Sequence, residues 1–323
     1  MNILLFTNMY PNDTHPYFGV FVKNFYDSYS AVYKNDNIEL LNIVPPKAGG
    51  SIINYLRIIP PLVKYRISGK VDVIHCQHAF CVLLAKIFNF RKIVYTNHEG
   101  EYFKKSLVEK IKILAIRLSD HVIFVNREMK CALDVELHAK AKSTFLPCPV
   151  SVQHFKISKE KNILKSELGF HDDKPLVFFP ANPNRNEKNF RFFLDVLEKW
   201  DEYTDLVKPN YVCGGNIEYD NMWMYYQACD VVLSCSLFES DGMIYKEALL
   251  NNRPFISSDV GNASYYAQLS GMGYIYSSGS IEEFIHKYRL ALDCNSDSFD
   301  SNHYFSSNLE TSVAKLNSIL RSV

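Results

Sequence analysis

The sequence predicts an α/β protein made of two doubly wound, Rossmann-like domains that face a central cleft. Short apolar runs alternate with amphipathic helical segments, and the alternation occurs twice along the chain, which indicates two sets of βαβ units. A chain of 323 residues also has the length of two domains of about 150 residues each. Ligands bind beyond the carboxyl ends of the strands in open parallel sheets, so we expect the chemistry in the cleft.

The apolar runs are short and apolar throughout, which is typical of strands buried on both faces in a parallel sheet. Such runs occupy 2–8, 38–44, 72–77, 92–98 and 121–126 in the first half, and 175–181, 211–214, 230–235, 254–260 and 274–277 in the second. Helical patterns fill part of the remainder, at 18–34, 103–118, 187–200, 242–251 and 280–293.

The rhythm of strand and helix is interrupted by a polar segment with two early prolines, "PCPVSVQHFKISKEK". We therefore expect an amino-terminal domain at 1–152 and a carboxyl-terminal domain at 153–302. The segment 303–323 reads as an amphipathic helix that packs back on the first domain.

Charge is distributed unevenly over a chain whose formal net charge is zero. Residues 1–150 carry 19 Lys and Arg against 12 Asp and Glu, and the second half has the opposite excess. The first half is thus predicted to meet an anionic partner, such as a lipid surface or a phosphate-bearing ligand, and not nucleic acid. The alternative is a chance imbalance of solvated faces.

The eight cysteines contain no Cys-x-x-Cys pair, and Cys76 and Cys235 fall in apolar strand-like runs. Buried thiols of this kind suit a reducing compartment rather than a disulfide framework. No metal-ligand spacing occurs, so no metal is expected. The segment "MNILLFTNMYPND" has no basic region and too short an apolar run for a signal peptide, which favours a cytoplasmic protein.

The stretch "DVVLSCSLFESDGMIYKEALL" reads as a strand, a loop and the start of a helix. Gly242 allows another group to approach the backbone closely. The amides of Met243 and Ile244 would then be donors at a helix N-terminus, where the helix dipole favours a phosphate. The alternative is that Ser240 or Asp241 caps the helix.

Two acids flank this helix start. Glu247 lies about one turn into the helix, and its carboxylate could accept two hydroxyl hydrogen bonds from a ribose. Glu239, in the loop, could hold hydroxyl groups of a sugar. On the preceding turn, "NRNEKNF", Arg185 and Lys188 could neutralise a diphosphate; the alternative there is a solvated basic turn with Glu187 as the partner.

These motifs carry a resemblance to a known family. "FESDGMIYKEALLNNRPFISSDVGN" resembles the Glu-x7-Glu signature of retaining family 4 glycosyltransferases with the GT-B fold, and "NRNEKNF" is similar to that family's phosphate motif. In the first half, "YPNDTHPYFGVFVKN", "DVIHCQHA" and "TNHEGE" resemble its first glycine loop, third-strand motif and His-Gly loop. Teichuronic-acid and capsule-type transferases of bacterial surface polysaccharides are the most similar group.

The resemblance implies that 1–152 is the acceptor-side domain and that 153–302 is the nucleotide-sugar-binding domain, and it implies a role for each matching residue. It implies that Glu247 contacts the ribose, that Glu239 contacts the donor sugar, that the amides of Met243 and Ile244 with Arg185 and Lys188 bind the diphosphate, and that Gly19 lets the phosphates approach. His98 would lie near the reacting carbon, although a strand-end histidine satisfied by backbone is the alternative. Asn216 and Ile217 are candidates to line the nucleobase pocket. His98, Glu239, Arg185 and Lys188 form the predicted catalytic set.

The sequence departs from the family pattern at two places. Cys148-Pro149 stands where the family often has Asn-Gly, which predicts a stiffer connection between the domains. Ser240 and Asp241 replace the usual residues after the first glutamate, which leaves the identity of the donor sugar open.

Two basic amphipathic segments lie in the first half, at 54–70 and 102–121. Their cations are Arg57, Lys64, Arg66, Lys70, Lys104, Lys105, Lys110, Lys112 and Arg117. Such segments can lie on anionic membranes, so peripheral contact with the inner face of the cell membrane is one expectation. The alternative is that the apolar stripes belong to the core.

The predicted activity is retaining, metal-independent transfer of a hexose from a nucleotide-diphosphate sugar to a lipid-linked or polysaccharide glycan. One alternative is a nucleotide-sugar epimerase of the same fold, and another is a non-catalytic subunit that binds a nucleotide sugar. A nicotinamide oxidoreductase is disfavoured because the first βα turn lacks Gly-x-Gly-x-x-Gly.

Overall fold

The computed structural model describes the chain except residues 12–18, 44–55, 99–106, 138–141, 151, 156–158 and 296–298. It divides into two compact units. The first domain comprises Met1–Pro149 together with Asn308–Val323, and the second domain comprises Val150–Ser307. Each domain holds one parallel sheet with helices on both faces, which confirms the predicted doubly wound fold class.

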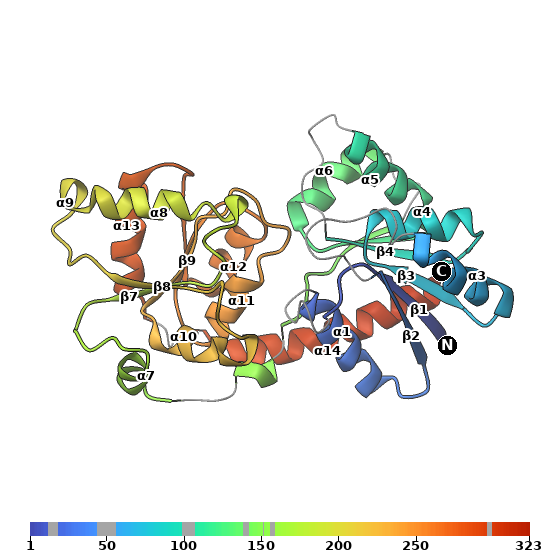
Figure 1. Ribbon diagram of the computed structural model, residues 1–323, viewed down its shortest axis with the longest axis horizontal. Helices are drawn as coiled ribbons and strands as arrows, with labels where there is room; N and C mark the ends of the chain where they lie inside the picture. The colour runs from blue at the N-terminus through green and yellow to red at the C-terminus, as the bar shows by residue number, and fades with distance from the viewer. Residues whose placement is uncertain are drawn as a thin grey trace. The chain divides into compact units, whose positions relative to one another are not determined.

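The sheet of the first domain has six parallel strands in the order β2-β1-β3-β4-β5-β6 (Figure 1). Their bounds are β1 Asn2–Thr7, β2 Asn37–Asn42, β3 Val73–Cys76, β4 Ile93–Asn97, β5 His121–Phe124 and β6 Lys142–Phe145. The central strands β3, β4 and β5 are buried throughout, as predicted. The expectation of burial on both faces is wrong for β2, where Leu41 is the buried residue, because β2 is an edge strand.

Two helical layers cover this sheet. One layer contains α3 Ile59–Ser68, α4 Ala79–Ile87, α5 Leu107–Leu118 and α6 Arg127–Leu137. The other contains α1 Val20–Val32 and the second part of α14 Ser301–Ser322. Val313 and Leu316 of α14 pack in one core with Ile3 and Leu5 of β1. Arg321 also donates from Nη2 to Oδ2 of Asp36 at 2.9 Å, so this end of the chain forms part of the first domain.

The sheet of the second domain has five parallel strands in the order β11-β10-β9-β7-β8. Their bounds are β7 Leu176–Phe179, β8 Asn210–Cys213, β9 Val231–Ser234, β10 Phe255–Ser258 and β11 Gly273–Tyr276. Figure 1 shows α8 and α13 on one face and α10 and α11 on the other. The helices are α7 Lys161–Glu167, α8 Phe190–Glu198, α9 Trp200–Tyr203, α10 Met222–Ala228, α11 Met243–Leu250, α12 Ala263–Ser270 and α13 Ile281–Leu292.

The helix expected at 187–200 begins only at Phe190, and it is interrupted again at Lys199, between α8 and α9. A 3-10 turn spans Asn186–Lys188, Asn189 then adopts a left-handed conformation with φ 50°, and α8 begins at Phe190. Asparagine tolerates this conformation better than most residues, which explains why the chain can bend there without glycine. The bend separates Lys188 from the helix and leaves it on the turn that follows β7.

The structure contains no long apolar helix of the kind that crosses a membrane, as far as its described residues go. All eight cysteines are free thiols.

Candidate functional site

The strand order of the second domain brings two predicted motifs together. Strands β7 and β9 are neighbours in the sheet, and the carboxyl ends of parallel neighbours meet at one edge. The turn after β7 carries Arg185 and Lys188, and the loop after β9 carries Glu239. The backbone amide of Leu237 donates to the carbonyl oxygen of Glu187 at 2.9 Å. A backbone hydrogen bond therefore joins the two loops.

Helix α11 begins at a glycine with no capping side chain among the described residues. Gly242 has φ 86° and ψ 74°, a left-handed conformation that favours glycine, and a Cβ there would collide with the ring of Tyr245. Within the described residues, the backbone amides of Met243 and Ile244 donate no hydrogen bond to another backbone group. The first turn of α11 thus presents donors and the positive end of a helix dipole.

Asp241, one of the two capping candidates, has its carboxylate held by other side chains. Its Oδ2 accepts from Nζ of Lys246 at 2.5 Å, and its Oδ1 accepts from Nδ2 of Asn262 at 2.6 Å. The side chains of Asp241 and Lys246 are 4% and 2% exposed, so this is a buried ion pair. The pair fixes the loop that leads to Gly242. Sequence reasoning missed Lys246, whose signal was a single cation inside the apolar stretch "MIYKEALL".

Glu239 and Lys188 are in direct contact. Nζ of Lys188 lies 2.5 Å from Oε1 of Glu239, and the hydroxyl of Ser236 donates to the same oxygen at 2.8 Å. The two charged side chains are largely buried, with 12% and 14% of their surfaces exposed. A cation beside an acceptor-only carboxylate can serve a phosphate and a sugar hydroxyl at adjacent positions.

Arg185 lies on the same turn but pairs with its neighbour. Its Nε donates to Oε1 of Glu187 at 2.8 Å, and its guanidinium is exposed. The backbone amide of Glu187 and then Arg185 lower the pKa of the Glu187 carboxyl. Arg185 therefore pairs with Glu187, as expected if this segment were only a solvated basic turn. Lys188 instead contacts Glu239 on the loop after β9.

Glu247 is held by a buried tyrosine. It is 8% exposed, and its Oε2 accepts from the hydroxyl of Tyr226 at 2.6 Å. Burial, followed by the charge of Glu247, raises the pKa of Tyr226 well above its usual range, so the hydroxyl remains a donor. Tyr226 lies on α10, in the stretch "MYYQACD" that precedes β9, and sequence reasoning gave it no role.

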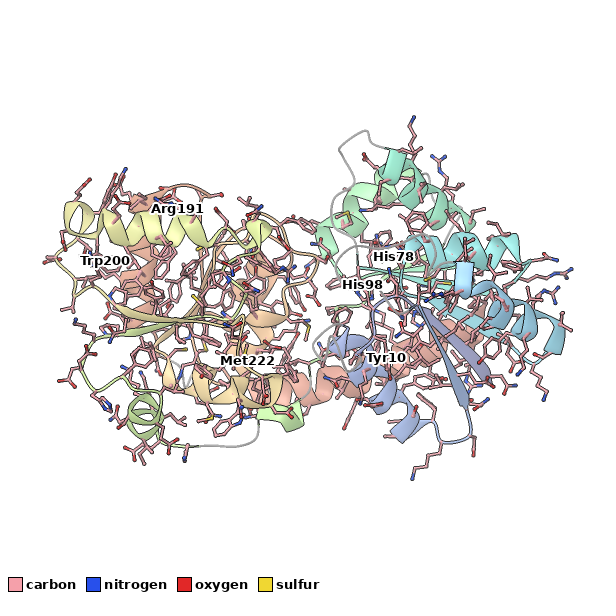
Figure 2. All side chains as sticks on the ribbon, viewed as in Figure 1. Tyr10, His78, His98, Arg191, Trp200 and Met222 are labelled. Atoms are coloured by element: carbon pink, nitrogen blue, oxygen red, sulfur yellow. The ribbon has the colours of Figure 1, made fainter. Side chains whose placement is uncertain are left out.

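The two residues predicted to line a nucleobase pocket follow the Gly214-Gly215 turn after β8. Asn216 is exposed, and Ile217 is half-buried against the core that contains Met222 (labelled in Figure 2). The candidate site of the second domain thus consists of the start of α11, the Lys188–Glu239 pair and the Tyr226–Glu247 pair. Among the described residues, neither Asn216 nor Ile217 forms a hydrogen bond with these parts.

In the first domain, Gly19 and His98 lie at the carboxyl edge of the sheet. Gly19 is the residue before α1 and has φ 75°, and a Cβ there would collide with the carbonyl group of Met9. The ring of Phe21, in the first turn of α1, lies with its centroid 4.9 Å from that of His98 (labelled in Figure 2). The structure thus brings the start of α1 and His98 to one edge.

His98 is connected to a chain of neutral polar groups. Its Nε2 lies 2.7 Å from Oε1 of Gln77, and its Nδ1 lies 3.7 Å from Sγ of Cys148. His75, next in the chain, contacts the hydroxyls of Tyr26 and Thr96. Burial, and secondarily His98, lower the pKa of His75 to about 3, so its imidazole is uncharged. Side chains, and not backbone alone, satisfy His98.

Among the residues described, three or more His, Cys, Asp or Glu side chains are nowhere grouped so that they could hold a metal ion.

Comparisons with known proteins match two family models to the chain. Residues 18–154 match the family model "Glycosyltransferase Family 4", and residues 203–311 match the model "Glycosyl transferases group 1". A protein of Klebsiella pneumoniae, described as an uncharacterized 41.2 kDa protein in the cps region, is 23% identical over 247 residues, which are 67% of this chain and 68% of that protein.

Solved structures share the fold at low sequence identity. Sucrose-phosphate synthase from Thermosynechococcus elongatus has a TM-score of 0.75 at 12% identity, over 99% of this chain and 98% of its own. HepE of Anabaena, in complex with UDP, has a TM-score of 0.73 at 15% identity over 100% of both chains. With a family 4 domain model matched in the first half and a group 1 domain model in the second, the chain is a glycosyltransferase of the GT-B fold.

Proposed function

We propose that the protein transfers a hexose, with retention of configuration, from a nucleotide-diphosphate sugar to a lipid-linked or polysaccharide glycan in the synthesis of a bacterial surface polysaccharide. The observation that carries this proposal is the contact between Lys188 and Glu239, which joins the turn after β7 to the loop that leads into α11. The named relatives support the same substrate classes, since HepE was crystallised with UDP and also with UDP-glucose, and the Klebsiella protein belongs to a cps region.

The donor would be bound by three kinds of contact. The amides of Met243 and Ile244 and the ammonium of Lys188 stabilise the diphosphate and the charge that develops on it as it leaves. Glu247, held by Tyr226, accepts hydrogen bonds from the ribose, and Glu239 accepts from hydroxyl groups of the sugar. Arg185 can join the diphosphate contacts by exchanging Glu187 for a phosphate oxygen.

The chemistry would rest on positioning and on electrostatics. In a front-face reaction the departing phosphate assists in deprotonating the acceptor hydroxyl, so no protein nucleophile is required, and we expect no metal. His98 would contact the transferred sugar from the first domain, where its ring is already oriented by Gln77.

Thermal-shift measurements with UDP-, GDP-, ADP- and CDP-sugars test the proposal, because a ligand that binds only the native state raises Tm. We expect one nucleotide class to raise Tm and Glu247→Gln to lose most of that shift. Glu283→Gln, an exposed acid on α13, is the matched control. If Glu247→Gln responds as wild type does, the ribose assignment is wrong.

Product analysis separates the alternatives. Conversion of the donor sugar without any acceptor would indicate an epimerase. Binding without turnover in every acceptor mixture would indicate a non-catalytic subunit.

Peripheral membrane contact remains part of the proposal, and exposed apolar residues support it. Leu107 and Leu114 of α5 are 74% and 46% exposed, while Ala115 and Ile116 face the core. Ile67, at the end of α3, is 80% exposed. Part of the apolar surface therefore accompanies the cations instead of packing in the core; Lys104 and Lys105 lie outside the described residues.

Flotation with liposomes tests the membrane contact. We expect binding to vesicles with anionic lipid that weakens as salt is raised, and reduced binding for the double variant Ile67→Ser/Leu107→Ser. Equal recovery with neutral and anionic vesicles would contradict it.

A further inference from the structure

A thiol, an imidazole and an amide oxygen lie in line at the carboxyl edge of the first sheet. Sγ of Cys148 is 3.7 Å from Nδ1 of His98, and Nε2 of the same ring is 2.7 Å from Oε1 of Gln77. Cys148 follows β6, Gln77 follows β3 and His98 follows β4, so three separate loops contribute to the cluster. The side chain of Gln77 is buried, and Cys148 is 8% exposed.

The hydrogen bonds determine where the protons lie. The amide oxygen of Gln77 can only accept, so Nε2 of His98 must carry a hydrogen. Nδ1 of a neutral ring is then an acceptor, and the group facing it is the thiol of Cys148. Proton transfer from Sγ to Nδ1 would give a thiolate beside an imidazolium that the Gln77 oxygen stabilises. The same order of thiol, imidazole and side-chain amide activates the cysteine nucleophiles of papain-like proteases.

We propose that Cys148 is an imidazole-activated thiol and a site of reversible oxidation by hydroperoxides. The other buried thiols differ in their surroundings. Burial raises the pKa of Cys229 and of Cys235 to about 12, which makes them poor nucleophiles. Cys148 combines similar burial with a base that can take its proton.

The size of the neighbouring pocket selects the class of reagent. Cys148 and His98 line an apolar pocket of about 20 Å³ together with Phe21, Pro147 and Pro149. Such a volume holds roughly one water-sized molecule. Hydrogen peroxide fits this description, whereas bulky alkylating reagents do not.

The oxidation step balances without a further reactant. The thiolate sulfur attacks one peroxide oxygen, an S–O bond forms and the O–O bond breaks. Sulfur is oxidised by two electrons, and the released hydroxide takes the proton from His98 Nδ1 and leaves as water. The product is a sulfenic acid, which thiols such as dithiothreitol reduce back to Cys.

Oxidation would change the group that faces His98. The sulfenic oxygen would occupy the pocket next to the ring and replace the thiol contact at Nδ1. We therefore expect sugar transfer to fall on oxidation and to return on reduction. This consequence rests on the proposed function, but the reactivity of the thiol does not.

Differential alkylation tests the thiol chemistry without any activity assay. The protein is exposed to hydrogen peroxide, and the reaction is quenched with catalase. The protein is then unfolded and alkylated with iodoacetamide, and each cysteine peptide is quantified by mass spectrometry. We expect Cys148 to be oxidised about 10-fold faster than Cys131, which is exposed on α6. His98→Asn and Gln77→Leu should both slow Cys148, and His171→Asn, an exposed histidine of the second domain, should not.

A Cys148 rate at or below that of Cys131 in the wild-type protein overturns the proposal, as does a rate that neither His98→Asn nor Gln77→Leu changes. The wild-type ratio needs no variant, so misfolding of a variant cannot hide the outcome. When sugar transfer is measured, peroxide should inhibit the wild-type protein reversibly. The transfer rate of Cys148→Ser should be the same with and without peroxide treatment. Fast oxidation of Cys148 in a protein with no transfer under any condition would refute the proposed function alone.

Discussion

The carboxyl edges of the two sheets hold their polar side chains by different means. In the second domain, charges meet in close pairs, Lys188 with Glu239 and Lys246 with Asp241. In the first domain, the amide of Gln77 lies between His75 and His98 and contacts both rings by hydrogen bonds, and no ion pair joins these three described residues. The comparison shows that opposite charges hold the loops of one edge in place, whereas side-chain hydrogen bonds hold the polar groups of the other.

The largest effect is expected from the buried ion pair of the second domain. Lys246→Met leaves the Asp241 carboxylate buried without its cation, which should lower the free energy of unfolding by about 3–5 kcal/mol. Urea unfolding measures this change. The double variant Asp241→Asn/Lys246→Met should recover part of the loss, and a single-variant loss below about 1 kcal/mol would mean that the pair does not support the loop.

Lys188 tests whether charge at this edge serves catalysis. Lys188→Met should reduce kcat by about 100-fold, because it removes a preorganised cation from the departing diphosphate. Arg191→Met is the matched control, since Arg191 (labelled in Figure 2) lies on α8 with 72% of its side chain exposed. It pairs with Asp195. Equal losses in the two variants would show that Lys188 has no special role.

His75, in the first domain, should make the free energy of unfolding depend on pH. The pKa of His75 is about 3 in the folded protein because of burial, whereas an unfolded histidine has a pKa of about 6.5. Below the unfolded value the unfolded chain binds a proton that the native protein does not, so stability falls as pH falls. From this residue we expect a loss of about 2 kcal/mol at pH 5 relative to neutral pH.

Urea unfolding of wild type and His75→Gln at pH 7.5 and pH 5 measures that contribution as a difference between the two proteins. An identical pH dependence would show that His75 is charged, or exposed, in the folded state.

Tyr226 gives the smallest effect and the closest control. Tyr226→Phe removes the hydrogen bond to Glu247 and should weaken donor binding about 10-fold. The hydroxyl of Tyr288 is buried and has no hydrogen-bond partner in the described part of the chain, so Tyr288→Phe should leave donor affinity unchanged. Titration calorimetry compares the two, and matching affinities would remove Tyr226 from the site.

Most of the architecture follows from local pattern. The apolar runs at 72–77 and 230–235 became β3 and β9 because central parallel strands are buried on both faces. Strand β6 was missed because its residues, "KSTF", lie at an edge and are partly exposed. Helix α4 was missed because "AFCVLLAKI" is almost entirely apolar and so has no helical period.

The site was less accessible to sequence reasoning because its contacts depend on strand order. Lys188 and Glu239 are 51 positions apart, and they meet because β7 and β9 are neighbours, which no single motif encodes. The same holds for Gln77 and His98, which follow adjacent strands. Residue types identified which side chains could act, whereas the sheet topology decided which of them are partners.

Helix α14 has a consequence for how the protein is made. Its residues Val313, Leu316, Ile319 and Leu320 complete a core that begins with Ile3 and Leu5. A ribosome reaches these four residues after every strand of the second domain has been synthesised. The first domain can therefore complete its core only after the second domain has been synthesised. Until then, the face of its sheet that α14 covers is exposed to solvent.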